Sequence, residues 1–236
     1  MGLLDEALDA AGGLDRWREF SRFTVYLSIK GELLNTKDRA GLPGELVAEG
    51  RTQSQALRLT GFIAPDKCCT YRPDHVAIEN LDGTTLRDRS NPQIALLSNR
   101  TSWDELDFAY FFGVSLWNYL TAPFLLALPG VETEELPTWH ENGEAWRRLV
   151  AVMPPNIVTH APRQTFYFDS AGLQRRLDYD VIDADAPHLV QRFSAHHSFS
   201  GIVIPTLRRC TASRPDGSLD PKRPCVDIEI FEASFE

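Results

Sequence analysis

Hydrophobic and polar residues change their period along the chain, and these changes divide it into predicted helices and strands. Residues 3–20 predict an amphipathic helix, divided at Gly12 and Gly13, because their apolar residues recur at helical spacing. Residues 23–30 instead alternate apolar with polar side chains, which is the period-two pattern of a strand with one buried face. The chain therefore changes early from helix to sheet.

Further strands are predicted on both sides of a long apolar segment. Before that segment they are residues 46–60, 68–72, and a hairpin of 75–80 with 84–89. After it they are 131–136, 144–153, 164–168, 173–182, 189–199, 202–210 and 225–233, and residues 214–224 read as a surface loop. The connections are short and carry turn residues, so neighbouring strands should pair as antiparallel hairpins. We expect an α+β fold in which residues 1–236 form a single domain around one large curved antiparallel sheet of about ten strands.

The apolar segment LDFAYFFGVSLWNYLTAPFLLAL, residues 106–128, is predicted to be helical and enclosed by that sheet. Ser102 and Glu105 can form a capping box, so the helix should begin near residue 102. Gly113 and Pro123 favour one broken helix or two short ones between 102 and 122. Polar side chains lie in its middle and no Lys or Arg cluster flanks it, which argues against a membrane span. An aromatic helix of this kind must be buried against protein on most sides.

Charge and motifs exclude several classes of function. Acids outnumber bases 33 to 24, giving a net charge of −9, and this opposes nucleic acid as a partner. The N-terminal residues lack the basic start and apolar run of a secretory signal, which indicates a cytoplasmic protein with reduced cysteines. No glycine-rich phosphate loop suggests a nucleotide cofactor, and adjacent strand residues His196 and His197 would face opposite ways, so neither a cofactor nor a metal is expected.

The register of the late strands can be predicted by matching apolar faces. The matched pairs are Phe168 with Leu173, Phe166 with Arg175, Tyr179 with Phe193, Leu177 with Ala195, Arg175 with His197, His197 with Ile204, and Phe199 with Ile202. This register places Arg175 and His197 side by side on an apolar face. It also disfavours a disulfide between Cys210 and Cys225, which would turn the apolar residues of the last strand outward.

The order of elements resembles a known fold. The segments TFYFDSAGLQRRLDY (165–179) and FSGIVIPTLRR (199–209) resemble the LolA/LolB-like bacterial lipoprotein carriers, and GGLDRWREFSRFTVYLSIKG with WNYLTAPFLLALPGV resembles a set of bacterial proteins of undescribed function. The resemblance implies an unclosed half-barrel whose concave face is filled by helices, with a hydrophobic cavity between them. The chain carries neither a signal peptide nor a lipobox cysteine near its start, so carriage of lipoproteins through a periplasm is not expected.

Two hypotheses about function follow, from different classes. The first is the binding of an apolar or aromatic small molecule between the sheet and the helix, as opposed to a helix that only fills the half-barrel. The predicted lining is Trp103, Phe111, Trp117, Tyr119, Phe124, Phe166, Phe168, Phe193 and Ile204. The second is a cofactor-independent lyase or isomerase with His197 as base, Arg175 as anion clamp and Tyr179 as acid. The simpler alternative is that His197 is a satisfied core histidine and Arg175 reaches water along its aliphatic stem.

A third class, an interaction or scaffold module, requires an exposed apolar patch outside the concave face. The sequence identifies no such patch.

Overall fold

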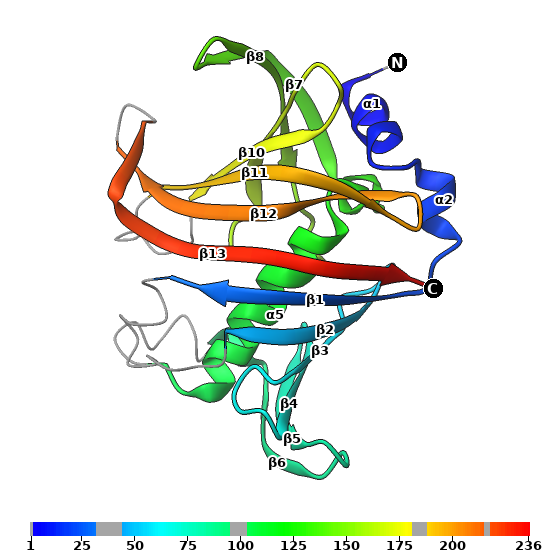
Figure 1. Cartoon of the computed structure of the whole chain (residues 1–236), viewed down its shortest axis with the longest axis vertical. Helices are drawn as coiled ribbons and strands as arrows, with labels where there is room; N and C mark the ends of the chain where they lie inside the picture. The colour runs from blue at the N-terminus through cyan, green and yellow to red at the C-terminus, as the bar shows by residue number, and fades with distance from the viewer. Residues whose placement is uncertain (1, 32–43, 95–102, 181–187, 215–217) are drawn as a thin grey trace.

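One antiparallel sheet contains every described strand of the chain (Figure 1). The computed structural model describes residues 2–31, 44–94, 103–180, 188–214 and 218–236. The strands are β1 (Arg22–Lys30), β2 (Glu45–Arg51), β3 (Leu57–Thr60), β4 (Lys67–Arg72), β5 (His75–Asn80), β6 (Thr85–Ser90), β7 (Glu132–Glu141), β8 (Glu144–Val152), β9 (Arg163–Phe168), β10 (Gln174–Asp180), β11 (His188–Phe199), β12 (Ile202–Ser213) and β13 (Leu219–Phe235).

The strand order is β6-β5-β4-β3-β2-β1-β13-β12-β11-β10-β9-β8-β7, so nearly all neighbours in space are neighbours in sequence. The exception is the pairing of β1 with β13, which joins the two halves of the chain. Strands β6 and β7 form the two edges of this order, and the sheet is therefore unclosed. It holds 13 strands over the described residues, more than the ten or so predicted, in part because 46–60 folds into two strands, β2 and β3.

The helices follow the sequence pattern with two corrections. Helices α1 (Leu3–Ala10) and α2 (Leu14–Arg18) are separated by Gly12 and Gly13, as predicted, and both glycines have positive φ. The aromatic helix α5 (Glu105–Thr121) begins later than expected, because Asp104 and Asp107 exchange side-chain to backbone hydrogen bonds of 3.0 Å at its first turn. The predicted cap, Ser102, lies outside the described residues.

Gly113 does not bend α5, and the prediction of a broken helix was wrong. The helix continues through Gly113 to Thr121, and a short 3-10 helix, η1 (Phe124–Ala127), follows Pro123. The glycine serves packing instead, because a Cβ at this position would lie 2.4 Å from Cγ of the Tyr71 ring. Strand β4 and helix α5 can approach this closely only because residue 113 has no side chain.

Helix α5 lies behind the central strands in Figure 1, on the concave side of the sheet, as predicted. Phe108, Phe112 and Trp117 are each at most 1% exposed, because the sheet covers them. None of the helices described in the structure has the length and apolar character needed to cross a membrane.

Two hydrophobic clusters fill the concave side. The larger joins α5 and α2 to β1–β5, β12 and β13, and the smaller joins α1 and η1 to β8–β11. Three partly buried side chains, Leu4, Tyr119 and Leu128, pack against both clusters. The boundary between the clusters therefore passes Tyr119.

Gly113→Ala tests the close approach of α5 to β4. Alanine gains about 1 kcal/mol of helix propensity over glycine, but overpacking costs about 1–3 kcal/mol. The clash should dominate, since the contacted atoms include the Tyr71 Cβ at 2.6 Å, which no side-chain rotation can move away from its backbone. We expect the free energy of unfolding to fall by about 1–2 kcal/mol in denaturant titration. Gly44→Ala is the control, because its Cβ would have no neighbour nearer than 3.9 Å among the described residues. Equal stability of both variants would contradict the packing role.

Candidate site around a buried arginine

The predicted pairing of strands β10 and β11 was wrong by four residues. Tyr179 pairs with Leu189 in place of Phe193, and Leu177 pairs with Gln191 in place of Ala195. Strand β9 is displaced as well, because Phe168 pairs with Gln174 in place of Leu173. The irregularity between Gln174 and Arg176 adds one more residue, so Phe166 pairs with Leu177 in place of Arg175. The predicted pairing of β11 with β12 is confirmed, with His197 opposite Ile204 and Phe199 opposite Ile202.

Arg175 and His197 consequently do not form the predicted pair. The Arg175 guanidinium donates to Asp169 at 2.7 Å and is about one third exposed. The His197 ring is exposed and lies 4.8 Å from the Phe199 ring, centroid to centroid. His196, not His197, is the half-buried histidine, and its Nε2 lies 3.0 Å from the backbone oxygen of Gln174. Of the predicted catalytic set, only Tyr179 lies in the interior, at 7% exposure.

Most of the predicted ligand-binding side chains are parts of the packed core. Five of them are at most 2% exposed: Trp117, Phe124, Phe166, Phe168 and Ile204. Phe124 stacks on Trp17 at 4.4 Å, and the Trp117 indole donates to the backbone oxygen of Arg51 at 2.8 Å. Phe193 is 3% exposed, whereas Trp103, Phe111 and Tyr119 are partly buried. These three are the predicted residues that a ligand could contact without displacing the core.

The interior also contains a charged residue that the sequence analysis did not select, Arg208 on β12. It is 3% exposed, and one guanidinium nitrogen, Nη2, donates to the backbone oxygen of Tyr119 at 2.6 Å. The other two nitrogens, Nε and Nη1, are buried and have no hydrogen-bond acceptor among the residues that the structure describes. The guanidinium carbon lies 5.0 Å from the Phe193 ring centroid and 5.7 Å from that of Tyr119. These ring faces stabilise the cation but accept none of its remaining hydrogen bonds.

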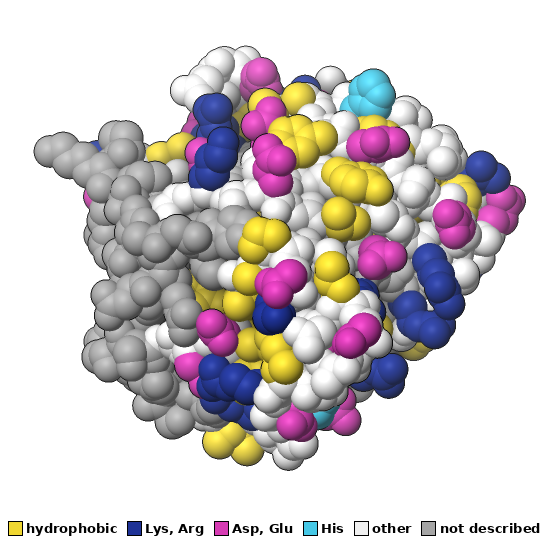
Figure 2. All heavy atoms as spheres, turned by 60° about the horizontal axis from the view of Figure 1, so that its bottom comes forward, with side chains coloured by type: hydrophobic (Ala, Val, Ile, Leu, Met, Phe, Trp, Pro, Cys, Tyr) yellow, Lys and Arg dark blue, Asp and Glu magenta, His cyan; other side chains and the backbone are white. Residues whose placement is uncertain are grey.

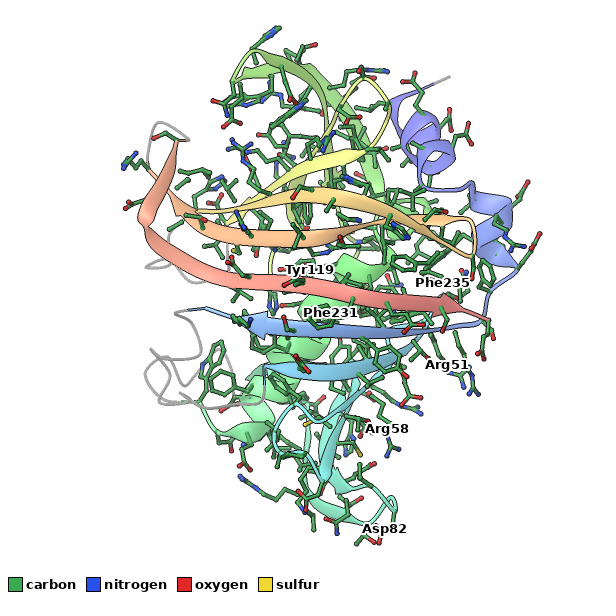
Figure 3. All side chains as sticks on the ribbon, in the orientation of Figure 1. Arg51, Arg58, Asp82, Tyr119, Phe231 and Phe235 are labelled. Atoms are coloured by element: carbon green, nitrogen blue, oxygen red, sulfur yellow. The ribbon has the colours of Figure 1, made fainter. Side chains whose placement is uncertain are left out.

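The Tyr119 ring near Arg208 ends in a hydroxyl that belongs to a row of hydroxyl and amide groups (Figure 3 labels Tyr119). Gln191 donates its amide to the Tyr179 hydroxyl at 3.0 Å, and the hydroxyls of Tyr179 and Tyr119 are 3.1 Å apart. Since Tyr179 accepts from Gln191, its own proton is free to be donated to Tyr119. The Tyr119 side chain therefore links this polar row to the boundary between the two hydrophobic clusters.

Burial sets the protonation states of these groups. It raises the pKa of Tyr119 to about 12 and moves the pKa of Tyr179 well above its usual value. It also lowers the pKa of Arg208 to about 10, although the electrostatic interaction with Tyr119 acts to raise that pKa. At neutral pH the site thus holds a cation and two neutral hydroxyls. When Tyr179 donates its proton to Tyr119, the Tyr119 proton is the one that can be donated to an anion.

Ser115, one helical turn before Tyr119 on α5, forms a second polar pair with His160. The His160 Nε2 lies 2.8 Å from the Ser115 hydroxyl and 3.1 Å from the backbone oxygen of Phe111, on whose ring it stacks. A carbonyl oxygen can only accept, so Nε2 carries the proton and donates to both oxygens. An imidazole in this state cannot take the serine proton at Nε2, which argues against a serine nucleophile. Burial lowers the pKa of His160 to about 4, so the ring is neutral at pH 7.

Arg176 is the second deeply buried arginine, and its surroundings are the opposite of those of Arg208. It is 1% exposed, yet its guanidinium donates twice to Asp178, at 2.6 and 2.9 Å, and once to Glu141 at 2.9 Å. Its carbon also lies 5.1 and 5.3 Å from the rings of Tyr167 and Trp139. Buried charges are normally paired in this way, which makes the bare Nε and Nη1 of Arg208 the anomaly.

Comparisons with known proteins identify the fold of this chain. No protein-family model and no curated protein matches its sequence. A LolA superfamily protein from Nitrosomonas europaea aligns with a TM-score of 0.52 and 9% identity, over 98% of this chain and 92% of its own. A DUF1329 family protein from Desulfovibrio piger has a TM-score of 0.52 and 12% identity, over 100% and 94%.

A third similar structure, from Vibrio parahaemolyticus, is described as an outer membrane lipoprotein-sorting protein domain. It aligns with a TM-score of 0.53 and 7% identity, over 96% of this chain and 93% of its own. These likenesses confirm the predicted LolA-like fold of an unclosed sheet. At such low identity they indicate the fold alone.

Replacing each buried arginine by methionine tests whether Arg208 is held at the expense of stability. Arg208→Met removes an incompletely paired charge, so we expect the free energy of unfolding to rise by about 1 kcal/mol or more. Arg176→Met leaves Asp178 and Glu141 without this partner and should lower it by about 3–5 kcal/mol. Denaturant titrations of the two variants measure both values. A loss of stability in Arg208→Met as large as in Arg176→Met would show that Arg208 is structural.

His160 should make stability depend on pH in the acid range. Its pKa falls from 6.5 in the unfolded chain to about 4 in the folded one, so between these values the unfolded state binds more protons. The contribution is complete above pH 6.5 and is lost as the pH falls to about 4, up to about 3 kcal/mol in all. Thermal unfolding from pH 7 to pH 4 should be less pH-dependent in His160→Gln and unchanged in a variant of the exposed His140. An equally steep profile in His160→Gln would contradict this assignment.

Proposed function

We propose that the chain binds a lipophilic molecule with an anionic head group on the concave side of the sheet, and that Arg208 is the counter-charge for this head. One observation carries the proposal, namely a 3% exposed guanidinium with two unsatisfied donor nitrogens in an apolar interior. Leaving such donors unsatisfied costs about 1–3 kcal/mol each. An acidic ligand would remove that penalty, and its apolar part would match the surrounding side chains.

The neighbours of Arg208 suit a ligand with an anionic head group and an apolar part. Tyr119 and Tyr179 are neutral at physiological pH, and because Tyr179 donates to Tyr119, the Tyr119 hydroxyl can add one hydrogen bond to a carboxylate or phosphate without repelling it. The partly buried aromatic rings of Trp103 and Phe111 supply a surface for the apolar part. The name of the Vibrio parahaemolyticus relative, which refers to lipoprotein sorting, is compatible with a lipophilic ligand.

In this proposal, residues 1–236 form one domain that binds its ligand without a cofactor. The cytoplasmic location expected from the sequence is part of the same proposal. The lyase or isomerase hypothesis with His197 and Arg175 is not carried forward, because the exposed ring and the ion-paired guanidinium do not share a site.

Matched probes that differ only in the head group test the proposal. A dansyl-labelled undecanoic acid and the corresponding alcohol are titrated into the protein, and binding is followed by dansyl fluorescence. A charge-assisted hydrogen bond contributes about 1.5–3 kcal/mol, so we expect the acid to bind roughly 10- to 100-fold more tightly than the alcohol. Arg208→Met should bind the acid and the alcohol equally. Arg209→Met, which removes an exposed charge from the same strand, should keep the preference.

The outcomes separate the two parts of the proposal. Loss of the acid preference in Arg208→Met with retention of alcohol binding supports both the apolar surface and the counter-charge. Equal binding of acid and alcohol by the unmodified protein contradicts the role of Arg208. Failure of both probes to bind, together with no lipophilic compound in mass spectra of extracts from freshly purified protein, contradicts ligand binding on the concave side.

A further inference from the structure

A hollow on the outer face of the sheet is surrounded by arginines. It has a volume of about 480 Å³ and lies over strands β1–β4. Its charged side chains are Arg22, Arg51, Arg58, Arg72, Glu49 and Glu236, which leaves a net charge of +2 on a chain whose total is −9. Figure 3 labels Arg51 and Arg58 on the lower right side of the sheet. We name these four arginines the arginine cradle.

The strand register explains why a hollow forms here. Arg22 lies opposite Arg51, and the backbone nitrogen of Arg51 donates to the oxygen of Ala56 at 3.1 Å. Leu57 lies opposite Tyr71, so the next step of the same register sets Ala56 opposite Arg72. The cross-strand row is therefore Arg22, Arg51, Ala56 and Arg72. The short side chain of Ala56 forms the floor, and strands about 4.8 Å apart place Arg51 and Arg72 about 10 Å from each other on either side of it.

The charges of the cradle are only partly balanced, because its four arginines share the hollow with two acids, Glu49 and Glu236. Across the described residues, none of the four arginines forms a side-chain hydrogen bond or an ion pair. Arg58 lies directly opposite Glu49 on the neighbouring strand, yet the two are not ion-paired. Arg22 and Arg51 are like charges in directly opposed positions, an arrangement that destabilises a sheet. Elsewhere on the surface, basic and acidic side chains lie side by side, as the face in Figure 2 shows.

We propose that the arginine cradle binds the phosphate group of an organic phosphate or of a lipid head group. A phosphate presents three terminal oxygens in different directions and carries up to two charges, so it can accept from two or more guanidinium forks at once. A carboxylate has two oxygens in one plane and fully occupies only one fork. A volume of 480 Å³ also exceeds that of a phosphate alone and falls within the range of small-molecule sites, which leaves room for the organic part of the ligand.

The site is independent of the ligand proposed for the concave face. Arg208 is a single desolvated charge in the interior, whereas three of the four cradle arginines are exposed and Arg58 is partly buried. Because guanidinium groups stay charged throughout the physiological range, the binding of a phosphate monoester should strengthen as the pH rises through its second ionisation near 6. It should weaken with added salt.

Isothermal titration with glycerol 1-phosphate, with glycerol as the uncharged probe, tests the site. We expect the phosphate to bind and glycerol not to bind. Arg51→Gln combined with Arg72→Gln should weaken phosphate binding by about tenfold or more. Arg18→Gln combined with Arg209→Gln removes the same charge from exposed positions outside the cradle and should leave binding within about twofold. Ala56→Glu, which places a carboxylate on the floor, should abolish binding, and thermal unfolding checks that each variant folds.

A second arm distinguishes the two sources of phosphate. Flotation with phosphatidylcholine vesicles that contain phosphatidate tests the lipid head group, with pure phosphatidylcholine vesicles as the control. Cradle-dependent binding of glycerol 1-phosphate or of the phosphatidate vesicles supports the proposal and identifies the source. Absence of both, or equal loss of binding in the two double variants, would falsify it.

Discussion

The pairing of β1 with β13 holds the molecule together as one sheet. The other pairings of the described strands join elements that are adjacent in sequence, and hairpins of this kind form two separate ribbons, β1–β6 and β7–β13. The register from Phe23 opposite Phe235 to Lys30 opposite Asp227 joins these ribbons across almost the whole length of the chain. Only then does a concave surface wide enough to cover α5 exist, and only then can Arg208 on β12 reach the backbone of Tyr119 on α5. The candidate site is therefore a product of the least local contact in the fold.

The elements of the fold could be predicted because their signals are local. The glycine pair that separates α1 from α2, the strand period of residues 23–30 and the aromatic content of α5 each report on a few neighbouring residues. The functions of single glycines could not be predicted in the same way. Gly113 was expected to bend its helix, but it accommodates the ring of Tyr71, a residue 42 positions earlier that no local pattern associates with it.

The candidate site was missed because the predicted register of β10 and β11 was wrong by four residues. That register set Gln191 opposite Val181, on the apolar face but away from Tyr179. The structure places Gln191 opposite Leu177, where its amide donates to the Tyr179 hydroxyl. The register of β11 with β12 was correct, and it sets Phe193 opposite Arg208. Arg208 also shares the parity of Ile202 and Ile204 along its strand. The sequence pattern thus predicts an inward side chain for Arg208, although the sequence analysis selected Arg175.

The two arginine sites illustrate different ways in which a protein can hold an uncompensated charge. A solvated guanidinium on the outer face loses little stability by lacking a partner, because water satisfies its donors. An anion site at the cradle is therefore supported by the number of its like charges and by their mutual repulsion. A desolvated guanidinium has no such alternative, and a single one is already unfavourable. The fully paired Arg176 demonstrates that this chain can satisfy a buried arginine with carboxylates when the only requirement is a stable fold. Arg208 keeps two bare nitrogens in the same sheet, and this contrast with Arg176 is the ground for proposing an acceptor from outside the chain.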